Sequence, residues 1–151
     1  MPLGAFKTAL MGAAGSGAAA FVATGGIITQ YDSGGSTYRV HAFRGTGKFV
    51  VASGEADVDW LIVAGGGASG TGGGGAGGMT TGTAFAASTT SGDSGTAVHT
   101  ITVGTGGLNG GNDSNTAGAT VGANSTALGQ TTVIGGGQGM SGASDACVTG
   151  G

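Results

Sequence analysis

The stretch Ala56-Asp-Val-Asp-Trp-Leu-Ile-Val-Ala-Gly-Gly-Gly67 decides the fold, because a β-prone run passes directly into glycine. Apolar residues alternate with acidic ones in its first half, which predicts a strand over 57–64 with one buried face: Val58, Trp60 and Ile62. Leu61 and Val63 make the second half apolar on both sides, so we expect this strand to be central in its sheet. The glycine run continues to residue 78 and offers no side chains for a core.

Three further strands are predicted upstream, over 27–31, 37–44 and 48–52, and glycine-containing turns separate them. In the second of these, alternation places two sets of side chains on opposite faces. One face carries Tyr38, Val40 and Ala42, and the other carries Arg39, His41 and Phe43. Turns at roughly ten-residue spacing favour a small antiparallel β-sandwich or a meander.

Downstream of residue 64 the same unit recurs, a short β-prone run followed by glycine. His99–Val103 leads into Gly104–Gly107, and a predicted strand over 131–134 leads into Gly135–Gly139. Glycine accounts for 39 of the 151 residues. Glycine segments can form a left-handed extended helix whose N–H and C=O groups pair only with neighbouring segments. We therefore expect a mainly β chain that continues into polyglycine-II-like structure.

The composition divides the chain into a leader over 1–25, a β unit over 26–64 and a glycine-rich region over 65–151. The last region reaches the chain end without a terminating element, so more chain or other subunits could be needed to complete it. In the leader, three apolar residues fall near helical spacing: Leu3, Phe6 and Leu10. This favours a short helical or extended segment that attaches to a partner particle. A cleavable signal peptide ending near Ala20 is the alternative.

Charge and cysteine content exclude several functional classes. The formal net charge is −3, and the four Lys and Arg residues form no basic run, which argues against nucleic-acid binding. No apolar stretch approaches the ~20 residues of a membrane span, so we expect no membrane insertion. Cys147 is the only cysteine, so the chain offers neither an internal disulfide nor a CxxC metal motif.

Two short patterns resemble chemical motifs. Gly65-x-Gly67-x-x-Gly70 follows a predicted strand like a dinucleotide-binding turn, but glycine continues where that motif needs a helix. Gly92-Asp93-Ser94-Gly95 matches the nucleophile motif of chymotrypsin-like proteases, and His41 and Asp57 or Asp59 precede Ser94 in the same order. The chain is too short for that double barrel. We expect no enzyme, no catalytic residue, no cofactor and no metal ligand, and we take His41 and His99 as ordinary strand histidines.

A family resemblance adds to this reading. Tyr38–Phe43, Gly47–Val50, Ala56–Gly67 and Gly72–Gly78 together resemble the glycine-rich domain of tailed-phage virion proteins, especially tail fibres of marine and cyanobacterial phages. The resemblance covers residues 26–139. It implies a structural or host-recognition role in the virion, often in trimeric fibres. A related class of phage adhesin carries variable loops at the tip of packed polyglycine helices.

The resemblance implies a tail-fibre or adhesin subunit located in the virion. Its expected partners are further copies of itself in a trimer, other virion proteins, and a host surface glycan or protein. The polar stretches between glycine runs supply the candidate receptor contacts: Asp93, Asn109, Asn112, Asp113 and Asn115. A capsid decoration or cement protein, and a secreted bacterial glycine-rich surface or matrix protein, are the alternatives.

Overall fold

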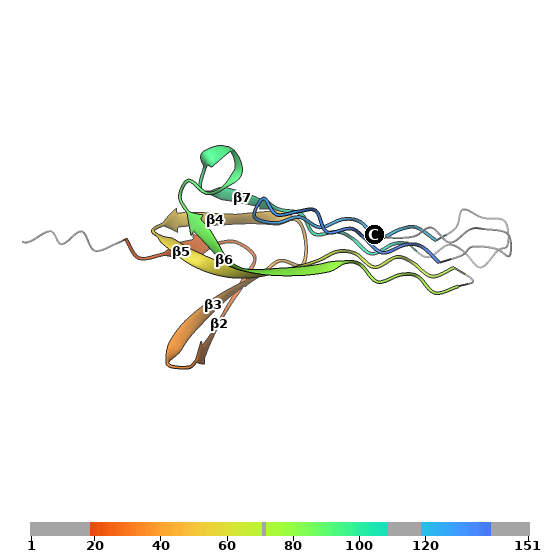
Figure 1. Cartoon of the computed structure of the whole chain (residues 1–151), viewed down its shortest axis with the longest axis horizontal. Helices are drawn as coiled ribbons and strands as arrows, with labels where there is room; N and C mark the ends of the chain where they lie inside the picture. Colours follow the sequence, from red (N-terminus) through yellow and green to blue (C-terminus); the bar gives the residue numbers. More distant parts are fainter. Residues whose placement is uncertain (1–18, 71, 109–118, 140–151) are drawn as a thin grey trace, which may run out of the picture.

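The computed structural model describes residues 19–70, 72–108 and 119–139, and it shows an elongated molecule (Figure 1). Strands form a body at one end, and glycine-rich segments form a stem at the other. Within the described ranges the structure is mainly β, with small antiparallel sheets and no α-helix, as the sequence predicts. The proposed attachment residues Leu3, Phe6 and Leu10 lie outside the described residues.

The first sheet of the body joins strands that are distant in sequence. It contains β1 (Val22–Thr24), β4 (Gly47–Ser53) and β7 (Val98–Ile101), with β4 in the middle and all pairs antiparallel. The sheet therefore joins one strand from the leader, one from the predicted β unit and one from the glycine-rich region.

The second sheet, β5 (Glu55–Val63) and β6 (Met79–Ser88), packs its inner face on the first. The shared core holds Ala23, Phe49, Val51, Ala87, Ile101 and Leu128, with Val58, Trp60 and Phe85 against it. Alternation along β5 explains this arrangement, because Val58 and Trp60 face inward whereas Asp57 and Leu61 are exposed. Of the two architectures expected from turn spacing, the body has the sandwich.

The strand predicted over 57–64 was expected to be central in its sheet, and that expectation is wrong. It corresponds to β5, which pairs only with β6, and its residues Leu61 and Val63 are 60% and 51% exposed. The expected strand over 131–134 is also wrong, because only Val133 forms an isolated bridge, with Ser125. Around residues 133 and 134 the backbone bonds to other stem segments instead, through Ser125 and Gly78.

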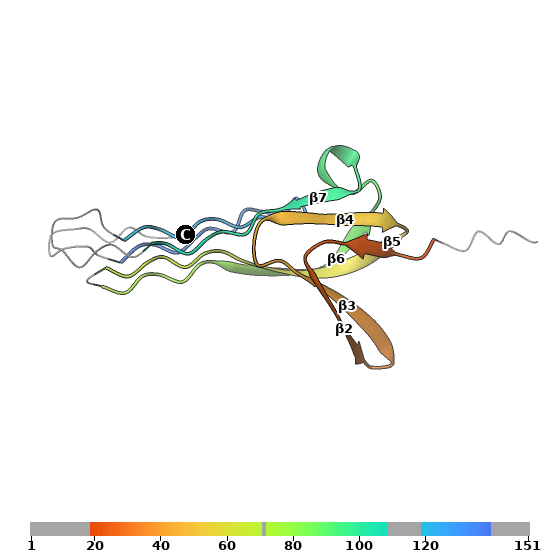
Figure 2. The ribbon, with the colours of Figure 1, turned by 180° about the vertical axis from the view of Figure 1, so that it is seen from behind.

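The hairpin of β2 (Ile27–Ser33) and β3 (Ser36–Ala42) projects from the body on the side of the second sheet (Figures 1 and 2). Its two-residue turn is Gly34-Gly35, whose φ angles of +58° and +80° suit glycine and match the twist of a tight hairpin. The register pairs Tyr31 with Tyr38 and Thr29 with Val40, which confirms the predicted division of β3 side chains between two faces.

The stem consists of five segments of the described chain, which run side by side (Figures 1 and 2): 64–70, 72–78, 102–108, 119–126 and 133–139. Segment 64–70 exchanges backbone hydrogen bonds with all four others. Gly67 N donates to Gly75 O at 2.8 Å, Gly107 N donates to Gly66 O at 2.8 Å, and Gly65 N donates to Ala123 O at 3.0 Å. The fourth neighbour donates instead, from Gly136 N to Gly65 O at 2.8 Å.

The outer segments are also bonded to one another. Gly75 N donates to Gly137 O at 2.7 Å, Gly122 N to Gly136 O at 2.8 Å, and Ala123 N to Thr105 O at 2.9 Å. The four outer segments thus surround segment 64–70 in the order 72–78, 133–139, 119–126, 102–108. The continuation of β5, rather than β5 itself, is therefore the central element of the molecule.

Glycine is required where the segments approach most closely. A Cβ added to Gly67 would collide with the carbonyl of Gly137, and one added to Gly122 would collide with that of Gly65. The spacing of the stem therefore depends on the absence of side chains at these positions.

One buried side chain joins the stem to the body. Ser125 is 2% exposed, and its Oγ donates to Val63 O at 2.8 Å and accepts from Gly104 N at 2.9 Å. It thereby links segments 102–108 and 119–126 to the end of β5. A small apolar cluster of Ile62, Ala64 and Val133 lies beside it and closes the base of the stem.

Candidate functional site

The pattern Gly65-x-Gly67-x-x-Gly70 does not form a phosphate-binding turn. Gly65 N donates to Ala123 O, Gly67 N to Gly75 O and Gly70 N to Gly72 O. A dinucleotide site needs such N–H groups free at the start of a helix, where they point at the pyrophosphate. In this protein those N–H groups donate to backbone carbonyls instead, so the same glycines hold the stem together.

The residues in protease-like order are each engaged elsewhere. The ring nitrogen Nδ1 of His41 bonds Gly25 O at 2.8 Å, and Asp59 Oδ1 accepts from Ala84 N at 3.1 Å. Asp57 is exposed on the outer face of β5. Ser94 lies in the short helical turn η1 (Asp93–Gly95) with φ of +56°. None of the hydrogen bonds among the described residues links these side chains into a nucleophile and its base.

A serine–histidine contact that the sequence did not indicate joins Ser91 to His99. Ser91 Oγ lies 3.1 Å from His99 Nε2 and donates its hydrogen to Ser88 O at 3.0 Å. The serine oxygen must then accept from Nε2, which is the opposite of the polarity that activates a nucleophile. His99 is 1% exposed and lies between Phe49 and Phe85. This contact is structural.

Burial also sets the protonation of this histidine. Loss of hydration lowers the pKa of His99 below its ordinary value, and the negative charge of Asp93 opposes that shift. Since burial disfavours the charged imidazolium, His99 is held in its neutral form. A neutral ring that donates through Nε2 matches the contact with Ser91.

Asp93, a candidate receptor contact, is exposed beside β7 and connects the η1 turn to that strand. Its Oδ2 accepts from Thr100 N at 2.8 Å, and hydrogen bonding to Thr100 holds the pKa of Asp93 below its ordinary value. The described segments 102–108 and 119–126, which border the stretch 109–118, belong instead to the stem (Figure 1), and Thr120 N donates there to Leu108 O. The other candidate contacts lie outside the described residues: Asn109, Asn112, Asp113 and Asn115.

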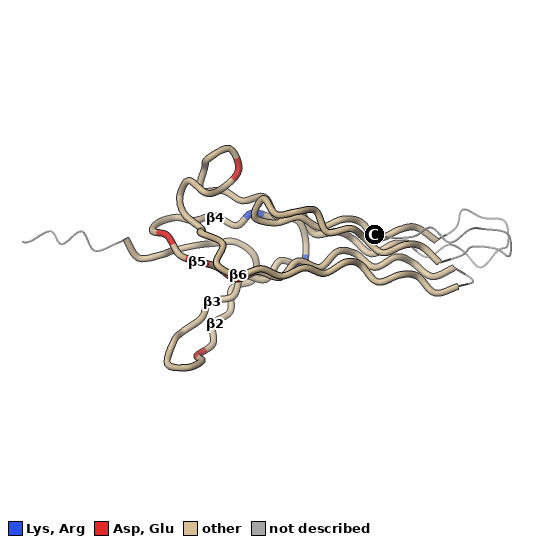
Figure 3. Tube along the Cα trace, viewed as in Figure 1, with Lys and Arg blue, Asp and Glu red and all other residues tan. Residues whose placement is uncertain are grey.

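At the far end of the stem, the ends of several described segments are hydrogen-bonded to one another. Gly70 N donates to Gly72 O in a tight reversal, Thr120 N donates to Leu108 O, and Gly139 N donates to Ala68 O. Leu108 is 76% exposed there. The segment ends at residues 70, 72, 108, 119 and 139 thus form a tip opposite the body (Figure 1). The tip is uncharged in the described chain, and the charged residues lie toward the body (Figure 3).

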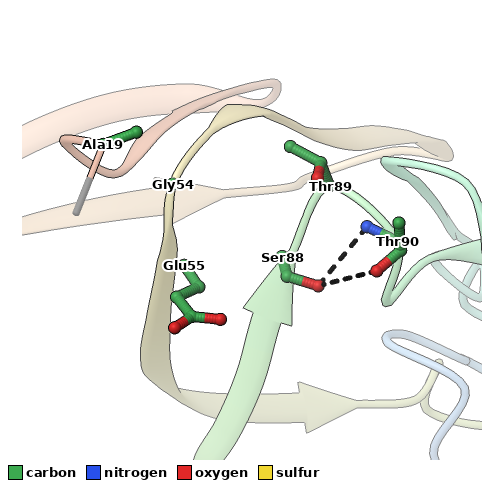
Figure 4. Close-up of a pocket in the computed structure, with 6 residues that line it drawn as sticks. All are labelled: Ala19, Gly54, Glu55, Ser88, Thr89 and Thr90. Atoms are coloured by element: carbon green, nitrogen blue, oxygen red, sulfur yellow. Dashed lines mark hydrogen bonds between the residues drawn. The ribbon is translucent and has the colours of Figure 1, made fainter. Parts of the chain in front are cut away.

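Two hollows lie in the body. The first is lined by Ala19, Gly54, Glu55, Ser88, Thr89 and Thr90, and Ser88 Oγ bonds both the amide and the hydroxyl of Thr90 within it (Figure 4). The second lies at the foot of the β2–β3 hairpin and includes Ile27, Phe43, Arg44 and Lys48. In the first hollow, no hydrogen bond among the described residues joins the Glu55 carboxylate to one of these hydroxyls. The part of the chain that the structure describes gathers no group of three or more His, Cys, Asp or Glu suited to a metal ion.

The surface that sequence reasoning missed is one face of the β2–β3 hairpin. Alternation and register bring Ile27, Tyr31, Tyr38 and Val40 to this face, and they are 54%, 52%, 48% and 41% exposed. The two tyrosine rings stack with centroids 5.2 Å apart. The grouping on one face was visible in the sequence, but its exposure depends on the hairpin leaving the body.

Comparisons with protein-family models, with curated proteins and with solved structures found no match for this chain. Across residues 19–70, 72–108 and 119–139, no helix has the length and apolar character needed to cross a bilayer.

Proposed function

We propose that this chain is a structural protein of a phage virion, a tail-fibre or adhesin subunit that attaches through its N-terminal part and projects its glycine-rich region for host recognition. The observation that carries the proposal is the stem, in which segment 64–70 bonds to four surrounding segments through backbone groups alone. We propose no catalytic role and no cofactor.

The stem suits a projecting element because its cohesion does not require a thick apolar interior. Lateral bonding of segments with three residues per turn is the arrangement open to polyglycine II helices. The collisions that a Cβ would make at Gly67 and Gly122 show how closely the backbones approach. Backbone groups that pair with one another in this way need neither side chains nor water as partners.

The polarity of the molecule supports attachment at one end and recognition at the other. The described chain enters at Ala19 on the body, whereas residues 70, 108 and 139 end at the tip of the stem (Figure 1). Connections at such a tip can change in length and sequence while the stem holds their ends in place. The proposal assigns host contacts to the polar residues between stem segments, including the candidates Asn109, Asn112, Asp113 and Asn115.

Amide exchange tests the stem in the working assembly. The expected result is slow exchange at Gly65, Gly67 and Gly75, whose N–H groups are bonded inside the stem. Exchange of these amides at the rate of an unstructured peptide, in assembled particles, would overturn the account of a rigid projecting stem.

Location tests the role. A tag at the C-terminal end, located by electron microscopy on assembled particles, is expected on the tail fibres. A regular distribution over the capsid lattice would show a decoration or cement protein instead. Sequencing of the mature N-terminus separates the secreted alternative, because removal of about the first 20 residues would show export by a cell.

A further inference from the structure

The β2–β3 hairpin presents an apolar face that the described chain leaves uncovered. The register puts Ile27, Tyr31, Tyr38 and Val40 on this hairpin face, and Gln30, Asp32, Thr37 and Arg39 on the opposite one. An amphipathic two-stranded ribbon normally turns its apolar side toward a core, because an isolated hairpin is only marginally stable in water. Here both sides of the ribbon are largely exposed, including Ile28 on the opposite side, so the apolar side is left uncovered.

A second uncovered apolar surface lies on the outer side of the β5–β6 sheet. Leu61, Val63 and Met79 are 60%, 51% and 68% exposed, and Val63 pairs directly with Met79 across the two strands. We call these three residues the sheet face. Contiguous exposed apolar groups of this kind mark interaction surfaces rather than ordinary solvent-facing positions.

The charges around the two faces are opposite. Arg44 and Lys48 are exposed around the hollow at the foot of the hairpin face. On the same strand as the sheet face, Glu55, Asp57 and Asp59 form an acidic row of exposed residues. A copy of the chain therefore carries both an apolar surface with basic residues and an apolar surface with acidic residues.

We propose that the hairpin face of one copy of this chain docks on the sheet face of a second copy, with Arg44 and Lys48 of the first directed toward the acidic row of the second. Opposite charges beside matching apolar surfaces favour this pairing over contact between two hairpin faces, which would bring the basic residues of both copies together. Because hairpin face and sheet face are different surfaces, each copy carries both halves of the contact.

This inference rests on the proposed function, in which the chain assembles with copies of itself, and it names the surfaces involved. The hairpin projects on the same side of the body as the β5–β6 sheet (Figures 1 and 2). A neighbour on that side can meet the hairpin while the stem stays free along its length.

Sedimentation of the full chain over a range of concentrations tests the contact. The wild type is expected to associate, and Val40→Asp on the hairpin face is expected to weaken association by about tenfold or more, because it places a charge in the apolar contact. Gln30→Asp is the matched control, since it adds the same charge to the opposite face of the same hairpin and should associate like the wild type. Leu61→Lys on the sheet face should weaken association as strongly as Val40→Asp.

Mixing the two weakened variants distinguishes hairpin-on-sheet docking from other contacts. A Val40→Asp copy keeps its sheet face, and a Leu61→Lys copy keeps its hairpin face, so the mixture is expected to form a one-to-one pair that neither variant forms alone. Failure of the mixture to pair, or undiminished association of Leu61→Lys alone, would overturn the proposal. Circular dichroism and stem amide exchange of each variant confirm that it is folded.

A monomeric wild type with a protected stem would also overturn this docking, and would leave a partner of another kind to cover the hairpin face. Such a result leaves the proposed function intact. Loss of stem protection, by contrast, would count against the proposed function itself, so the two failures are separate.

Discussion

At the scale of single residues, Ser125 is the side chain that links the body to the stem. Its hydroxyl is shared between Val63 O and Gly104 N, at the point where β5 becomes the stem. An apolar replacement would remove the partner of a part-buried carbonyl and a part-buried amide, and unpaired groups of this kind cost stability.

We therefore expect Ser125→Ala to lower the free energy of unfolding by about 1–3 kcal/mol. Denaturant unfolding followed by the fluorescence of Trp60, the single tryptophan, measures the change. Ser69→Ala is the control, because Ser69 is exposed on the stem, and it should leave the unfolding midpoint unchanged. Equal stability of the two variants would show that the Ser125 bonds contribute nothing net.

His99 gives the body a pH-dependent stability. Its pKa is lower in the folded protein than the ordinary value of 6.5, so the unfolded chain takes up the proton first as the pH falls. The stabilisation is complete above that value and is lost as the pH falls below it toward the folded-state pKa. We expect the unfolding free energy to decrease between pH 7 and pH 5.

Chemical unfolding at several pH values, on the wild type and on His99→Gln, checks this assignment. The variant should be less stable at pH 7, but its stability should change less with pH over this interval. A pH dependence that is unchanged in His99→Gln would show that the titration belongs to another group.

At the scale of elements, neighbouring glycines of one stem segment have different environments. A Cβ on Gly66 would have Gly75 O as its nearest atom, at 3.7 Å, which is an ordinary contact, whereas a Cβ on Gly67 would collide with Gly137 O. Neither residue has a positive φ that would itself forbid alanine. The difference between them therefore reports only on the spacing of the segments.

We expect Gly67→Ala to destabilise the stem by about 1–3 kcal/mol through overpacking. Gly66→Ala is expected to be neutral or to stabilise by up to about 1 kcal/mol, since alanine restricts the unfolded chain. Amide exchange at Gly75 and Gly136 in each variant measures the effect where the segments meet. The same loss of protection in both variants would mean that the segments do not lie as close as the structure places them.

The strands that sequence reasoning located well are those with local signals. The β2–β3 hairpin follows from alternation plus Gly34-Gly35, and β4 and β5 follow from runs of β-prone residues. β6 was missed because Gly82, Ala84 and Ala86 are weak strand formers, and it exists because β5 lies opposite it. β1 was missed for a similar reason, since its three residues depend on pairing with β4.

The candidate sites were harder to predict than the strands. A glycine pattern carries no information on whether its N–H groups face a ligand or another segment, and Gly65 and Gly67 prove to face other segments. The contact between Ser91 and His99 depends on the turn between β6 and β7, which no spacing rule encodes. The apolar hairpin face was grouped correctly from alternation, but which way it faces is a property of the whole fold.

At the scale of the whole molecule, the body and the stem are stabilised by different forces. The body has a core of apolar side chains, whereas the stem buries peptide groups and few apolar atoms. Exposure of apolar surface raises the heat capacity on unfolding, and exposure of polar surface lowers it.

We therefore expect the heat-capacity change of unfolding to fall clearly below the ~12–15 cal/mol/K per residue of ordinary globular domains. Scanning calorimetry at several pH values, which gives the enthalpy at different melting temperatures, measures it. An ordinary value per residue would show that the stem buries as much apolar surface as a side-chain core does.

The lateral bonds between glycine segments have a consequence for alignment. In the polyglycine-II arrangement that we propose for the stem, with three residues per turn, sliding one bare segment past its neighbours by a turn recreates nearly the same set of bonds. Only positions with side chains can mark the right alignment, and the stem has them near both ends. Asn124 Oδ1 accepts from Gly135 N at 2.9 Å near the body, and Thr120 Oγ1 accepts from Leu108 N at 2.7 Å near the tip. These few polar side chains fix the lengthwise alignment of segments whose glycine backbones would otherwise slide past one another.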